Sequence, residues 1–77
     1  MSRDDPFRVD WFALLIDLQR HGFPTSQVAK MVDVPVGTVM GWKNGGAEPR
    51  HVDGDRLVDL WVGITGKNRH QVPRVDC

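Results

Sequence analysis

The segment from Thr25 to Asn44, TSQVAKMVDVPVGTVMGWKN, constrains the fold more than any other part of the chain. Apolar and small residues recur at helical spacing on both sides of a short break at Asp33. Asp tolerates a left-handed backbone better than most non-glycine residues, so it suits a tight turn. Pro35 suits the start of the next helix, where its missing amide donor costs nothing. The pattern predicts one short helix ending near Val32 and a second over about residues 35–43.

The spacing within this segment is typical of a helix-turn-helix. Ala29 lies four residues before Asp33 and ten before Val39, and Trp42 lies three after Val39. A small residue is needed where the two helices cross, while Val39 and Trp42 are expected to face inward. A generic pair of packed helices is the alternative, and the joint spacing argues against it. The commonest use of a helix-turn-helix is to place its second helix in the major groove of DNA.

Longer apolar stripes predict a helix on each side of this segment. Asp10 is a good N-cap for a helix over Trp11–His21, since its carboxylate accepts from free amides at the positive end of the dipole. The last helix is expected to begin near Asp53, capped by it, and to end at Gly66 in a left-handed conformation. Thr25 or Ser26 is expected to cap the helix between them. The inward stripes are Trp11, Leu14, Leu15 and Leu18 in the first helix and Leu57, Leu60, Trp61 and Ile64 in the last.

Together these helices predict an all-α, compact four-helix domain over residues 10–66. Residues 1–9 are polar, lack periodicity and are expected to form a flexible arm. The polar tail, residues 67–77, is expected to be ordered only if it docks. A chain of 77 residues makes one domain with a small core.

Composition argues against several classes of protein. With 40% hydrophobic and 26% charged residues, the chain is expected to fold. The single cysteine, Cys77, allows no intramolecular disulfide, and the histidines are too far apart for a metal site. Neither a Ser-His-Asp order nor a Gly-rich phosphate loop is present, so we expect no enzyme, metal or cofactor. The absence of a signal peptide and of a membrane-spanning run fits a cytoplasmic protein.

The net charge is zero, from ten basic and ten acidic residues. Most nucleic-acid binders are basic, because phosphate contacts supply much of their affinity, so this balance counts against DNA binding. The charge is unevenly distributed, however. Residues 24–50 and the tail carry small positive excesses, whereas residues 1–20 and 51–65 carry negative ones. The positive charge therefore lies around the expected helix-turn-helix and in the tail.

The segment Thr25–Asn44 resembles the helix-turn-helix of the Cro/lambda-repressor-like superfamily, in which an alanine, a turn glycine, a valine or isoleucine, and often a tryptophan follow in that order. The continuation, GWKNGGAEPRHVDGDRLVDLWVGITGK, is similar to small phage and prophage helix-turn-helix proteins. The resemblance covers about Leu14–Lys67 and implies a lambda-repressor-like DNA-binding fold. Asp33 departs from it, because the family usually has glycine there, which makes the turn less relaxed but feasible.

A helix over residues 35–43 would present few polar side chains to a DNA groove. Bases are told apart mainly by Arg, Lys, Asn and Gln, whereas apolar groups contact thymine methyls and glycines let the backbone approach closely. The residues expected to contact bases are Val36, Gly37, Thr38, Met40, Gly41 and Asn44. Those expected to contact phosphates, through hydroxyls, free amides or cationic groups, are Thr25, Ser26, Gln27, Lys30, Lys43 and Arg50. Arg50 can instead cap the last helix or pair with its acids.

These features predict a sequence-specific or weakly specific double-stranded DNA-binding protein, a phage-type transcription regulator. A unit this small binds weakly alone, so a homodimer on paired half-sites is expected, with Val58 and Val62 as the contact. The alternative is a protein-interaction module on the same scaffold, such as a phage assembly factor or a host-protein antagonist. The neutral charge and the apolar pair Val36 and Met40 favour that alternative.

Overall fold

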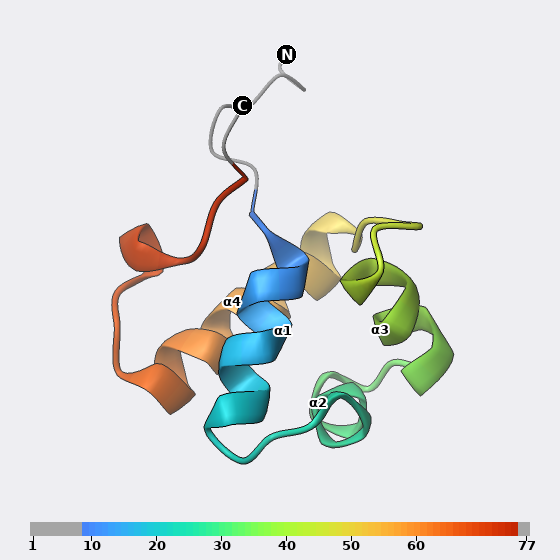
Figure 1. Ribbon diagram of the computed structural model, residues 1–77, viewed down its shortest axis with the longest axis horizontal. Helices are drawn as coiled ribbons and strands as arrows, with labels where there is room; N and C mark the ends of the chain where they lie inside the picture. Colours follow the sequence, from blue (N-terminus) through green and yellow to red (C-terminus); the bar gives the residue numbers. More distant parts are fainter. Residues whose placement is uncertain (1–8, 76–77) are drawn as a thin grey trace.

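The computed structural model describes residues 9–75, and its regular structure is helical. Figure 1 shows α1 at the centre, α4 behind it, and α2 and α3 together at one side. The first helix packs against the other three, whereas α3 packs against α1 and α2 but, within the described residues, not against α4. The elements are α1 (Trp11–Arg20), α2 (Thr25–Val32), α3 (Val36–Lys43), α4 (His51–Thr65) and a 3-10 turn, η1 (Arg69–Gln71). The predicted all-α, four-helix architecture is confirmed.

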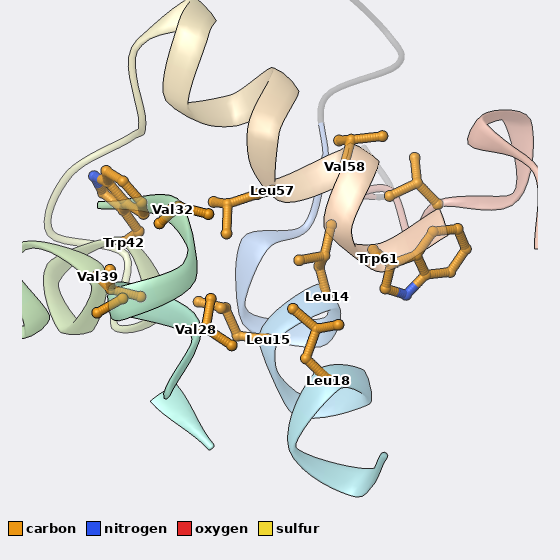
Figure 2. Packing of buried hydrophobic residues seen from close by; sticks show 12 residues of the cluster. Leu14, Leu15, Leu18, Val28, Val32, Val39, Trp42, Leu57, Val58 and Trp61 are labelled. Atoms are coloured by element: carbon orange, nitrogen blue, oxygen red, sulfur yellow. The ribbon is translucent and has the colours of Figure 1, made fainter. Parts of the chain in front are cut away.

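Apolar side chains from all four α-helices converge on one core (Figure 2). Ala29, Val39 and Trp42 are buried as predicted, so the inward positions of the central segment are confirmed. Trp11 is half-buried at the edge of the core and was expected further inside. The buried side chains are Leu14, Leu15, Leu18, Val28, Ala29, Val32, Val39, Trp42, Leu57, Val58, Trp61 and Val72.

The first helix is fixed at its start and at its middle. The Ala13 amide donates to the Asp10 carboxylate at 3.1 Å, which confirms Asp10 as the N-cap. The helix ends at Arg20, one residue before the predicted end. The indole N–H of Trp61 donates to the Asp17 carboxylate at 3.1 Å, which ties α4 to α1 beside the core.

The turn between α2 and α3 has the predicted left-handed residue. Asp33 has φ 60° and ψ 49°, and the Val34 amide donates to the Ala29 carbonyl at 3.0 Å, which closes the end of α2. The Arg56 guanidinium reaches from α4 to the Val32 carbonyl at 3.3 Å. A cation at the carboxyl end of α2 is favourable for its dipole and fixes the turn to α4.

Two predicted helix caps are wrong. Pro24 is the N-cap of α2, and its carbonyl accepts from the Gln27 and Val28 amides, so Thr25 and Ser26 already lie inside the helix. The last helix begins at His51, because the Gly54 amide already donates to the Arg50 carbonyl at 2.7 Å. Asp53 lies in its first turn, where a carboxylate still favours the positive end of the dipole.

The C-terminal tail docks on the helices as far as Val75, the last described residue. Val72 is buried with the core, and the Pro73 carbonyl accepts from the Asp10 amide at 2.9 Å. Arg69 pairs with Asp55 at 2.9 Å and with Asp59, both on α4. The predicted N-terminal arm, apart from Val9, lies outside the described residues. Among residues 9–75, no helix is long and apolar enough to cross a bilayer.

Candidate nucleic-acid interface

The third helix presents one side to solvent, which we call the α3 face. Val39 and Trp42 point into the core, so the opposite side of the helix is free. Val36 is 47% exposed and Met40 is 41% exposed, so both apolar side chains are largely in contact with solvent. The α3 face consists of Val36, Gly37, Met40, Gly41 and Asn44. Each of these predicted base-contacting residues is exposed except Gly41, which is half-buried.

Tertiary packing, not local propensity, holds α3 in place. Glycine costs about 1 kcal/mol in a helix interior relative to alanine, and this eight-residue helix contains Gly37 and Gly41. A helix of this length is not stable in isolation. The buried side chains of Val39 and Trp42 therefore anchor α3 to α1 and α2.

The fold gives no steric reason for the glycines of α3. A Cβ atom placed on Gly37 or Gly41 would meet nothing within 4 Å, and neither glycine has a positive φ. Gly54 in α4 is different, because a Cβ there would lie 3.1 Å from the Trp11 ring. No packing contact within the protein therefore requires glycine at these two positions. Without side chains there, another molecule can approach the α3 backbone closely.

Three of the predicted phosphate-contacting residues are cations on separate elements. Lys30 projects from α2, Lys43 lies in the last turn of α3, and Arg50 precedes α4. Within the described part of the chain, none of these cations forms an ion pair. The loop that brings Arg50 back folds tightly: Gly45 has φ 82°, and the Gly46 amide donates to the Gly41 carbonyl at 3.0 Å.

The amino end of α2 adds hydrogen-bond donors to the predicted phosphate-contacting set. Ser26 and Gln27 are exposed and Thr25 is half-buried. The Gln27 amide is used by the Pro24 carbonyl, whereas the Thr25 and Ser26 amides find no partner among residues 9–75. Free amides and hydroxyls at the positive end of a helix suit an anion such as phosphate.

Other predicted features do not join this surface. Val58 is 7% exposed and belongs to the core, and Val62 is half-buried, so they form no exposed strip suited to a dimer contact. The η1 part of the tail lies at the opposite side of the molecule from α3 (Figure 1), whereas Val75 at the end of the described tail lines a cavity with Trp42 and Lys43. Its Arg69 is engaged by acids of α4, and Lys67 lies 6.0 Å from the Trp61 ring centre. The tail therefore does not extend the positive charge around α3.

Two features of α2 were not predicted. Met31 on α2 is 45% exposed, and the inward stripe Val28, Ala29 and Val32 already implies that it points outward. Arg56 holds the end of α2 from α4. No local pattern predicts that contact, because the two residues are distant in the sequence.

Among the described residues, no group of three or more His, Cys, Asp or Glu side chains gathers where it could hold a metal ion. Comparison of the chain with protein-family models, with curated proteins and with solved structures finds no match. Function is therefore inferred from the surface of this chain itself.

Proposed function

We propose that α2 and α3 form a helix-turn-helix and that the protein binds double-stranded DNA with α3 in the major groove. One observation carries this proposal: α3 has an exposed, partly bare face, and Lys43 in its last turn forms no ion pair among the described residues. The major groove admits a helix, and the phosphates on either side of it attract such cations. A phage-type transcription regulator with weak or moderate sequence specificity fits this surface.

The electrostatics of the molecule support this orientation. The chain has no net charge, but Arg69 pairs with Asp55 and Asp59 away from α3. Lys30, Lys43 and Arg50 form no ion pair among the described residues and are the proposed phosphate contacts. Three cations give only weak binding to DNA. We therefore propose that two copies of the protein act on half-sites one helical turn apart.

Replacing Lys43 by alanine is expected to weaken binding to all duplexes alike, because a phosphate contact carries no sequence information. For a unit with contacts from Lys30, Lys43 and Arg50, affinity should fall about 40-fold between about 50 and 200 mM salt. Lys43→Ala should reduce the slope of log affinity against log salt concentration by about 1. Fluorescence anisotropy with a labelled duplex library, repeated across salt concentrations, measures both quantities.

Lys67→Ala is the matched control, because it removes the same charge from the segment between α4 and η1, which lies at the other side of the molecule from α3 (Figure 1). It should leave affinity and salt slope nearly unchanged. Lys30→Ala, at an exposed position of α2, should behave like Lys43→Ala without disturbing the half-buried stem of Lys43. Equal losses in the Lys43 and Lys67 variants would contradict the assignment of α3 as the contact, and no retention of any duplex at low salt would contradict DNA binding.

A second candidate function is a protein-interaction module, for example a phage assembly factor or a host-protein antagonist. The exposure of Val36 and Met40 on a chain without net charge favours it. Under this alternative, Met40→Glu abolishes binding to a purified protein partner. Neither the unaltered protein nor Met40→Glu retains a duplex at low salt. Retention of duplex DNA that Met40→Glu abolishes supports the first proposal instead.

A further inference from the structure

The residues of the α3 face are not equivalent. At about 100° per residue, Gly37 and Asn44 lie opposite the buried Val39 and Trp42, at the centre of the face. Val36 and Met40 lie together along one edge and Gly41 lies toward the other. Thr38 is exposed but lies roughly 160° around the helix from Met40, so it cannot contact the same base pairs.

The side-chain chemistry of this face matches one class of base pair. Guanine is bound mainly by Arg or Lys, and cytosine by Asp or Glu, and the α3 face has none of these residues. Adenine is bound by Asn or Gln through two hydrogen bonds, and Asn44 is such a residue. The methyl group of thymine is contacted by apolar groups, and Val36 and Met40 are exposed apolar side chains.

Lys43 does not alter this match. It lies on the flank of the helix beside Val36, roughly 110° from the centre of the face, so it stands outside the residues proposed to face the bases. In the proposed complex its charge contacts a phosphate. A cation outside the base-facing residues fits a DNA groove, in which the phosphates lie at the rim and the thymine methyl groups lie within.

We infer that the α3 face distinguishes A·T from G·C base pairs, with Val36 and Met40 contacting thymine methyl groups and Asn44 contacting the adjacent adenine edge. This inference rests on the proposed function, that the ligand is duplex DNA. The absence of side chains at Gly37 and Gly41 leaves Val36, Met40 and Asn44 as the side chains that project from the face. Burial of one methyl group against an apolar side chain changes affinity by about fourfold.

The test uses the full chain and duplexes of equal length at low salt. One duplex is rich in A·T pairs in mixed order, the second has uracil in place of every thymine, and the third is rich in G·C pairs. The uracil duplex keeps every hydrogen-bonding group and loses the methyl groups alone. We expect the thymine duplex to bind more tightly than the uracil duplex by about fourfold for each contacted methyl, and more tightly than the G·C duplex.

Met40→Ala is expected to shrink the thymine-to-uracil ratio by about fourfold, whereas Val52→Ala, at an exposed apolar position of α4, should keep it. Both positions are exposed, and the circular dichroism of each variant checks that the helices are intact. Equal affinity for all three duplexes, or a ratio that Met40→Ala leaves unchanged, would overturn the inference while DNA binding itself stands. If no duplex is retained at all, the proposed function fails and this inference with it.

Discussion

Trp61→Ala is expected to lower the free energy of unfolding by about 3–5 kcal/mol, the usual cost of removing a buried large aromatic side chain. Trp61 is 1% exposed and packs between α1 and α4 near Leu14, Leu18 and Val58 (Figure 2). A domain of 77 residues has a total stability of about 4–11 kcal/mol, so this loss leaves a large unfolded population. Urea unfolding followed by far-ultraviolet circular dichroism measures the change.

A second variant separates the packing of Trp61 from its hydrogen bond. Trp61→Phe keeps a buried ring but removes the N–H that donates to the half-buried Asp17, and is expected to cost about 1–3 kcal/mol. Val52→Ala, at an exposed position of the same helix, is a control that should change stability by less than about 0.5 kcal/mol. A loss below about 1 kcal/mol in Trp61→Ala would contradict the described core.

Gly37→Ala and Gly41→Ala are each expected to stabilise the protein by about 0.5–1 kcal/mol and to weaken DNA binding about tenfold. The gain in stability follows because alanine favours the helix and its Cβ meets open space at both positions. The loss of affinity follows because an added methyl group holds a closely approaching groove away from the backbone. Stability and affinity therefore change in opposite directions, which a general disturbance of the fold does not produce.

Gly63→Ala is the matched control for this experiment. Gly63 is exposed within α4, and a Cβ atom there would also meet nothing within 4 Å. The variant should gain the same stability as the α3 variants and keep full affinity for DNA. If all three variants bind DNA equally well, α3 does not approach the groove closely, and its glycines have another explanation.

The parts of the fold that depend on neighbouring residues could be predicted from the sequence. Helical spacing placed Val39 and Trp42 in the core, a carboxylate before an apolar stripe identified Asp10 as a cap, and the left-handed turn at Asp33 followed from its side chain. The same spacing left Val36 and Met40 outside. The residue types on the α3 face could therefore be predicted from the sequence.

The parts that depend on distant residues could not be predicted in this way. The tail has a polar sequence, and its docking depends on Val72 finding the core and on Arg69 finding acids of α4. Val58 had the pattern of an exposed strip and is buried, because a stripe alone does not show how many neighbours cover it. The start of α4 was misplaced because Asp53 suits both an N-cap and a first turn, and the backbone decides between them.

The most direct test of the central claim is a titration of the isotope-labelled protein with a duplex at low salt, followed by the backbone amide signals in nuclear magnetic resonance. We expect the largest shifts at residues 36–44, with the amides of Gly37 and Gly41 prominent among them, and smaller ones at Thr25, Ser26 and Arg50. The signals of η1, at the other side of the molecule, should stay in place. Shifts confined to α4 and the tail, or no shifts at any duplex concentration, would contradict the claim that α3 is the DNA-binding helix.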